Sequence, residues 1–273
     1  MRKSVLSAAV AAALAVPTLV AAQTPAPAPA PTPAVTGNIA LVSDYRFRGI
    51  SQTFDKPAIQ GGFDYAHASG IYLGNWNSNV SQGAGFPGGN IEMDFYGGWK
   101  KAFGDFGLDV GFIYYYYPGT DSPGPTGIGA PFNNRTGEVA SGKVDNKEFY
   151  IGGTWKFLSL KYFQSLDDYF STPDTKNTTY IDLSGTYDFG GGWGLVGHVG
   201  HLNFKNMDNA SYTDWKLGVT KDISGWVFGA AYVDTDAKGD CGSGQFYCFF
   251  NTSGKETKDV GKSTVVLSVS KTF

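Results

Sequence analysis

Apolar and polar residues alternate with a period of two along most of this chain. In residues 106–116, the apolar side chains Leu108, Val110 and Phe112 alternate with Gly and Asp109. Successive side chains of a strand point to opposite faces, so this period predicts strands with one apolar and one polar face. Twelve such segments are expected, at residues 38–48, 58–66, 70–78, 90–100, 106–116, 146–157, 158–167, 179–189, 193–202, 212–220, 226–235 and 263–273. Residues 70–78 alternate less cleanly than the others, so the sequence leaves open which of their faces is inward.

The connections between these segments alternate between short and long. Those after the second, fourth, sixth, eighth and tenth segments are minimal, whereas most of the others are long and rich in Gly, Pro, Asn and Ser. The longest are residues 118–145 and 236–262. Short turns at one end and long loops at the other are typical of transmembrane barrels, with the short turns in the periplasm and the long loops outside the cell. The sequence therefore predicts an all-β protein, a transmembrane antiparallel β-barrel of 12 strands.

The rival fold is a soluble β-sandwich, which also has many alternating strands. Aromatic residues make up 15% of the chain and charged residues only 16%, whereas about 25% charged is usual for soluble domains. Mean hydropathy is −0.18, and beyond the N-terminus no apolar run approaches the roughly 18 residues of a spanning helix. Aromatic residues on nearly every apolar face, opposite a face of charges and glycines, favour the barrel. The net charge of −3 gives no reason to expect a nucleic-acid partner.

The N-terminal region predicts export. Arg2 and Lys3 precede a short apolar run that ends in small residues at Ala22, as in a cleaved signal peptide. Alternating Pro and Ala then form a segment that cannot pack a core and adopts extended structure. An exported barrel of this kind is expected in the bacterial outer membrane. The expected organisation is a signal peptide at 1–22, a periplasmic spacer at 23–37 and the barrel at 38–273.

The only two cysteines, Cys241 and Cys248, lie in one loop-like segment. In an exported chain this spacing predicts a local disulfide. The neighbouring DTDAKGD (234–240) has a fragment of calcium-loop spacing. Lys238 takes the third acidic position and no downstream Glu completes the loop, so a solvated loop is expected here and no metal site.

The stretch SDYRFRGISQTFDKPAIQGGFDYAHASGIYLGNWNSNV (43–80) contains an S-D-Y-x-F-R-G-x-S-Q block, then P-A-x-Q-G and G-x-Y-x-G-x-W-x-S-N. These blocks, with YTDWKLGVTKDISGWVFGAAYVDTD (212–236), resemble the TorF-type family of porin-like proteins from proteobacteria. The resemblance implies a porin-like barrel and brings no assigned substrate and no catalytic residues.

The polar face of the strands is expected to line a narrow lumen of mixed charge. A barrel of twelve strands is intermediate in width between one that side chains fill and one that holds an aqueous channel. Inward glycines favour an open passage. Tyr45 and Phe47 are expected on the lipid face. The long loop that contains Arg135 and Glu138 is expected to fold inward as a constriction. The expected lining residues are Asp44, Arg46, Arg48, Asp64, Glu92, Asp94, Lys100, Asp109, Glu148, Lys156, Asp182, Asp188, Asp214 and Lys216.

These features indicate a porin for small hydrophilic solutes or ions. The alternative is a structural or adhesive barrel, in which the charges pair across a closed lumen and the outer loops carry the function. No enzyme and no cofactor is expected, because His198 and His201 have no nucleophile beside them in sequence and point to opposite faces. The expected partners are outer-membrane lipid, the solutes, and the barrel-assembly machinery through the terminal Phe273. Association into homo-oligomers is left open.

Overall fold

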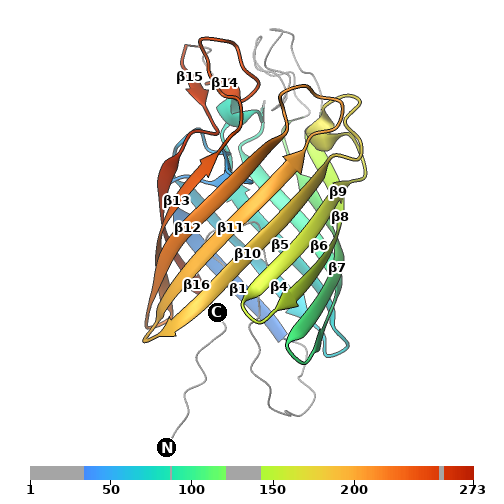
Figure 1. Cartoon of the computed structure of the whole chain (residues 1–273), viewed down its shortest axis with the longest axis vertical. Coiled ribbons are helices and arrows are strands. Elements are labelled where there is room, and N and C mark those ends of the chain that lie inside the picture. Colours follow the sequence, from blue (N-terminus) through green and yellow to red (C-terminus); the bar gives the residue numbers. More distant parts are fainter. Residues whose placement is uncertain (1–33, 87, 121–142, 252–254) are drawn as a thin grey trace, which may run out of the picture.

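Twelve long strands close into one antiparallel barrel in the computed structural model, which describes residues 34–86, 88–120, 143–251 and 255–273. Long loops gather at one end of the barrel and short turns at the other (Figure 1). The wall strands are β1 (Ala34–Val42), β4 (Ala58–Ala66), β5 (Ile71–Asn79), β6 (Ile91–Phe103), β7 (Phe106–Tyr116), β8 (Asp145–Trp155), β9 (Leu158–Ser165), β10 (Thr179–Gly190), β11 (Trp193–Asn203), β12 (Tyr212–Ile223), β13 (Trp226–Thr235) and β16 (Thr264–Thr272).

The barrel closes through β1, which pairs with both β4 and β16. Leu41 is in register with Ile59 on one side and with Val269 on the other. Closure leaves no wall strand with an unpaired edge, which is the condition for a sheet surrounded by lipid. Among the described residues, no helix is both long enough and apolar enough to cross a membrane.

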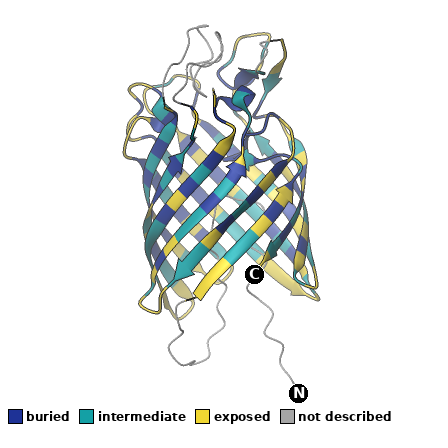
Figure 2. Ribbon diagram, turned by 180° about the vertical axis from the view of Figure 1, so that it is seen from behind, coloured by how far each residue is buried: buried dark blue, intermediate teal, exposed yellow. Residues whose placement is uncertain are grey.

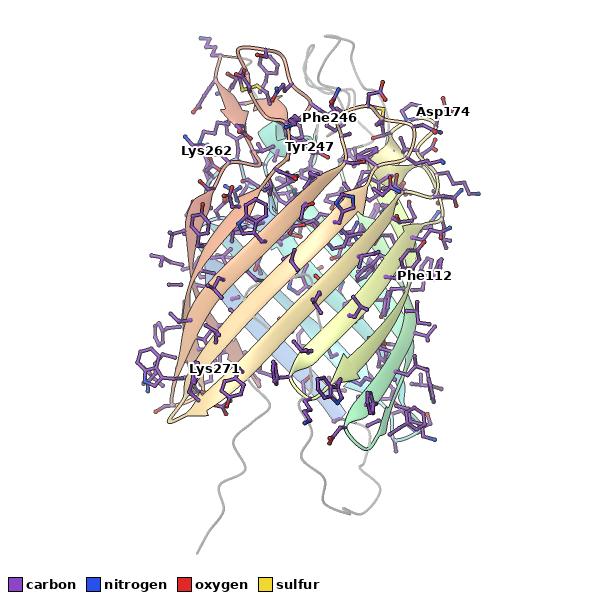
Figure 3. The ribbon with its side chains drawn as sticks, viewed as in Figure 1. Phe112, Asp174, Phe246, Tyr247, Lys262 and Lys271 are labelled. Atoms are coloured by element: carbon purple, nitrogen blue, oxygen red, sulfur yellow. A yellow bond between two sulfur atoms is a disulfide. The ribbon has the colours of Figure 1, made fainter. Side chains whose placement is uncertain are left out.

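The outer face of the wall is apolar. Phe63 and Leu217 are 66% and 60% exposed, and exposed and buried residues alternate along each strand (Figure 2). Phe112 points away from the barrel (Figure 3). An apolar outer surface of this kind needs lipid around it, because soluble proteins rarely expose contiguous apolar surface.

Aromatic side chains ring the outer face near the short-turn end, and lysines cover several of them. The ammonium group lies 4.7 to 5.0 Å from the ring centroid in each of three such pairs. Long basic side chains and amphipathic aromatic rings both favour the boundary between hydrocarbon and water. The three pairs are Lys156 with Trp155, Lys221 with Trp193, and Lys271 with Trp226.

The first expected strand, 38–48, was wrong in its second half. The wall strand begins earlier, at Ala34, and ends at Val42. The chain then turns into the barrel as a hairpin of β2 (Arg46–Phe47) and β3 (Ile50–Ser51). We call residues 43–57 the lumen hairpin.

Tyr45 and Phe47, expected on the lipid face, lie inside on this hairpin and are 4% and 6% exposed. Arg48 and Gly49 form its tip, with φ of 48° and 79°. Positive φ at both central residues matches the turn that joins two tightly paired antiparallel strands. The alternation in SDYRFR therefore belongs to a short internal ribbon rather than to the wall.

Above the wall, the long loops carry small elements of their own. Cys241 and Cys248 form a disulfide beside the ribbon of β14 (Cys248–Phe250) and β15 (Thr257–Asp259). Two 3-10 turns, η1 (Gln82–Ala84) and η2 (Tyr169–Ser171), also lie at this end. The expected signal peptide, most of the spacer, and the loop with Arg135 and Glu138 lie outside the described residues.

Candidate functional site: the lumen and its hairpin

Arg46 fastens the base of the lumen hairpin. Its guanidinium pairs with Asp44 and, at 3.0 Å, with Asp55. It also donates to the backbone carbonyls of Val260 and Lys262 at 2.9 and 3.0 Å. The five donors of one guanidinium thus join both ends of the hairpin to the loop that leads into β16.

Arg48 fastens the tip to the far wall. Its Nη1 and Nη2 donate to Oε1 and Oε2 of Glu148 on β8, at 3.0 and 2.7 Å, and Nη1 also donates to the Tyr169 hydroxyl at 2.9 Å. The guanidinium carbon lies 4.3 Å from the ring centroid of Tyr180, and Tyr212 donates its hydroxyl to the Arg48 carbonyl at 2.8 Å. Two parallel hydrogen bonds to a carboxylate and contact with aromatic ring faces are the interactions that a buried guanidinium requires.

The hairpin tip also presses against the wall at β12 and β13. A Cβ at Gly49 would lie 2.4 Å from Thr235 Cγ2 and 2.7 Å from Asp214 Cβ. Only glycine fits this close approach, and it also accepts the positive φ. The hairpin therefore reaches from β1 to β8, β12 and β13, across the whole interior.

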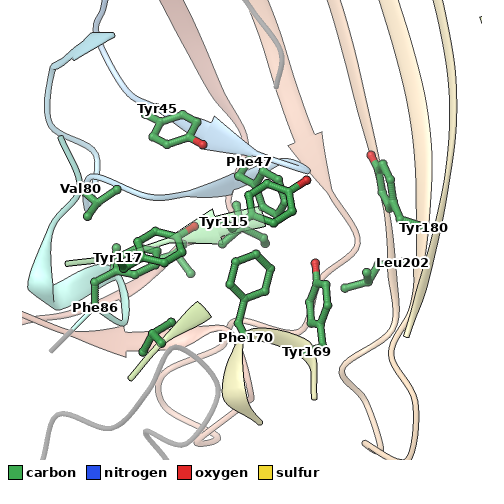
Figure 4. Close-up of a cluster of buried hydrophobic side chains, with 14 of the residues drawn as sticks. Tyr45, Phe47, Val80, Phe86, Tyr115, Tyr117, Tyr169, Phe170, Tyr180 and Leu202 are labelled. Atoms are coloured by element: carbon green, nitrogen blue, oxygen red, sulfur yellow. The ribbon is translucent and has the colours of Figure 1, made fainter. Parts of the chain in front are cut away.

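An aromatic layer packs around the hairpin at the long-loop end (Figure 4). The Phe47 ring meets Tyr115 and Phe170 edge-on, with centroids 5.5 and 5.7 Å apart. Phe86 stacks on Tyr117 at 4.4 Å. Rings from the hairpin, from β7 and from the outer loops thus form one buried core, so the interior of the barrel is packed with side chains at this end.

Toward the short-turn end, polar side chains bond across the wall. Lys161 Nζ donates to Asp109 at 2.7 Å, and Tyr72 donates its hydroxyl to the same carboxylate at 2.6 Å. The Tyr72 and Tyr150 hydroxyls are also hydrogen-bonded to each other. These groups lie on β5 and on the neighbouring strands β7, β8 and β9, and they satisfy one another's hydrogen-bonding capacity.

Inward glycines, expected to leave an open passage, instead make room for these tyrosines. Gly98 is in register with Tyr72, and Gly111 with Tyr150. A Cβ at Gly98 would lie 2.6 Å from the Tyr72 hydroxyl oxygen, and one at Gly111 would lie 2.4 Å from that of Tyr150. A ring laid over a cross-strand glycine covers the bare backbone, so the glycine volume does not become passage.

His198 lies on the inner wall between two carboxylates. Its Nδ1 and Nε2 are each 2.6 Å from an oxygen, of Asp182 and of Asp214 respectively. Ser184 donates to Asp182 at 2.5 Å and lies 3.4 Å from Nδ1. Because Asp182 occupies the nitrogen that a nucleophilic serine would need, this group is not a catalytic triad. His201 is exposed on the opposite face, as its spacing predicted.

The His198 cluster was not found from the sequence, because its members sit on three different strands, β10, β11 and β12. Within a single strand the histidine looked isolated. Only the register brings them together: His198 is opposite Lys216, and Asp182 and Asp214 are both opposite Gly200.

The sequence matches, over residues 26–273, the family described as "Bacterial protein of unknown function (Gcw_chp)". The chain belongs to the Gcw_chp family. No curated protein matches this sequence. The family description does not carry the TorF name, so the likeness to TorF-type proteins remains a resemblance of the sequence.

This Gcw_chp protein is similar to solved structures of porins. The "KdgM porin" has a TM-score of 0.50 at 9% identity, over 87% of this chain and 99% of that one. The "NanC porin structure in rhombohedral crystal form" has a TM-score of 0.46 at 9% identity, over 88% and 99%. At 9% identity the likeness to the KdgM porin shows the fold alone.

The expected lining residues of the Gcw_chp barrel divide into four groups. Asp44, Arg46 and Arg48 lie inside, but on the hairpin instead of the wall. Lys156 was wrongly placed, since it is exposed in the β8–β9 turn over the Trp155 ring. Nine are on the inner wall: Asp64, Glu92, Asp94, Lys100, Asp109, Glu148, Asp182, Asp214 and Lys216.

Asp188 forms the fourth group. It keeps the inward phase of β10 but is exposed at the short-turn end, where it accepts a hydrogen bond from the Gly190 amide at 2.7 Å. Asp188 therefore lies at the mouth of the barrel.

Proposed function

We propose that this Gcw_chp protein is a porin-like channel of the bacterial outer membrane, which lets small hydrophilic solutes or ions diffuse through a narrow lumen of mixed charge. The short turns would face the periplasm and the long loops the outside. The apolar outer face with its aromatic and lysine ring supports a place in lipid. The resemblance of residues 43–80 to TorF-type proteins agrees with this function.

The charged inner wall is the observation that carries the proposal. Nine charged side chains from the sequence prediction occupy inner-wall positions, from the level of the hairpin to the short-turn end. A barrel that only supports loops can be filled with apolar side chains at less desolvation cost. Charged linings are what ion and solute pores use for selectivity.

A second candidate is supported by the lumen hairpin itself. The hairpin crosses the interior, and aromatic rings pack around it at the long-loop end. On this alternative, the barrel is closed and its outer loops, including the ribbon of β14 and β15, carry a structural or adhesive role. Neither candidate uses a catalytic centre.

Single-channel recording in planar bilayers separates the two. The channel proposal expects discrete current steps from refolded protein that scale with salt concentration. If folded protein gave no steps, and a variant without the hairpin gave none either, the closed structural barrel would be the better proposal.

A further inference from the structure

Two carboxylates lie buried on β6 with almost no hydrogen bonds. Glu92 and Asp94 occupy successive inward positions, and both are 0% exposed. Glu92 Oε1 accepts from the Tyr117 hydroxyl at 2.9 Å. Glu92 Oε2 and both Asp94 oxygens have no hydrogen-bond partner among the described residues. Buried anions without partners are strongly unfavourable, so these two acids either bind protons or are compensated by a cation.

No basic side chain in the described lumen serves these two acids. The nearest candidate is Arg48, but Glu148 holds its guanidinium through two hydrogen bonds. The charged groups that act on Asp94 are Glu92 and Glu148, both of them acidic. Arg48 is therefore the one cation beside the three carboxylates of Glu92, Asp94 and Glu148 in the described lumen. When all three are ionised, two negative charges remain unbalanced.

The lumen hairpin brings a third oxygen to the same place. Tyr45 is 4% exposed and its hydroxyl has no hydrogen-bond partner among the described residues. The groups that act on this hydroxyl are Glu92, Asp94 and Tyr115, and Glu92 lies near enough for a side-chain contact with it. The Tyr45 ring meets Trp76 edge-on, with centroids 5.3 Å apart, and Trp76 is the register partner of Asp94 on β5. A buried phenol on the hairpin thus lies beside the two acids on the wall, of which Asp94 has no hydrogen bond among the described residues.

We propose that Glu92, Asp94 and Tyr45 form a binding site for one hard divalent cation of the Ca²⁺ class. A single divalent charge balances the two carboxylates, and a set made only of oxygen atoms suits Ca²⁺ rather than the softer transition metals. Because Tyr45 belongs to the hairpin and the two acids to β6, the bound cation fastens the hairpin to the wall, near the Arg48–Glu148 pair. The site does not depend on whether the lumen conducts.

The test uses the full chain, refolded in detergent and stripped with a chelator. Tb³⁺ serves as the probe, because Trp76 and Tyr45 lie close enough to sensitise its luminescence, and Ca²⁺ then competes with it. The expected results are a Tb³⁺ signal that Ca²⁺ displaces and a Ca²⁺-dependent rise in Tm. In Glu92→Gln/Asp94→Asn the apparent affinity should fall at least about tenfold and the Tm rise should vanish. Tyr45→Phe, which keeps both acids, should bind with an intermediate affinity.

Two control variants should bind the probe as wild type does. Asp64→Asn removes an inward carboxylate that already accepts a hydrogen bond from Tyr96 at 2.6 Å, and Asp240→Asn removes an exposed acid of the outer loops. In the presence of the chelator, Glu92→Gln/Asp94→Asn should be at least as stable as wild type, because neutral amides are buried without the desolvation cost of two carboxylates. Equal binding by wild type and the double variant, loss of binding in Asp240→Asn instead, or no effect of Tb³⁺ and Ca²⁺ on wild type would each overturn the proposal. The last result would mean that the two acids are simply protonated.

Discussion

Arg48 and Glu148 are separated by 100 residues in sequence, yet two parallel hydrogen bonds of 2.7 and 3.0 Å join them across the barrel. Both side chains are almost completely buried, with 4% and 1% exposure. Arg48 comes from the lumen hairpin and Glu148 from the opposite wall, so this pair sets how far the hairpin reaches into the interior.

Glu148→Gln should destabilise the barrel because it leaves the Arg48 cation buried without its counter-charge. The expected loss in the free energy of unfolding is about 3–5 kcal/mol, measured by urea unfolding in detergent with tryptophan fluorescence. The double variant Arg48→Met/Glu148→Met removes both charges and should recover most of that loss. A Glu148→Gln protein as stable as wild type would mean that the pair does not hold the hairpin.

Gly111→Ala should disturb the inner wall, because its Cβ would lie 2.4 Å from the Tyr150 hydroxyl oxygen. Overpacking of this kind costs about 1–3 kcal/mol. Gly153→Ala is the matched control. It lies on the outer face of β8, where a Cβ would meet only the Gly107 carbonyl at 3.8 Å. Both changes remove a glycine from a strand, so an equal effect on unfolding would argue against the ring-over-glycine packing.

Leu217→Arg tests whether the outer face lies in lipid. Leu217 is in the middle of β12 and 60% exposed, whereas Ile223 is at the short-turn end of the same strand and 54% exposed. In a bilayer, arginine costs about 2–4 kcal/mol near the midplane and about 0–1 kcal/mol near the interface. Unfolding of Leu217→Arg and Ile223→Arg in lipid vesicles should show this difference. Similar values for both variants would contradict the placement in a membrane.

The twelve wall strands could be predicted because nearly all of them carry their own signal. A strand between lipid and a polar interior must alternate, as residues 106–116 do, and the alternation does not depend on distant parts of the chain. The local disulfide between Cys241 and Cys248 could be predicted for the same reason, since both partners lie in one short segment.

The lumen hairpin could not be predicted in this way. Its residues alternate as a wall strand does, and the period of two does not say which neighbour a strand pairs with. The only local sign was Gly49, whose positive φ permits the turn at the tip. Its long-range contacts, such as Arg48 with Glu148 and Tyr45 with Trp76, depend on the closed barrel, and no local pattern encodes them.

The most direct test is single-channel conductance of the refolded protein, compared with a variant in which a short Gly-Ser linker replaces residues 44–55. Small current steps are expected from the wild type, and severalfold larger steps from the variant, because the hairpin and its arginine anchors no longer cross the lumen. Both proteins should first show the heat-dependent shift in electrophoretic mobility of a folded barrel. Folded variant protein that carries no more current than wild type would contradict a channel obstructed by the hairpin.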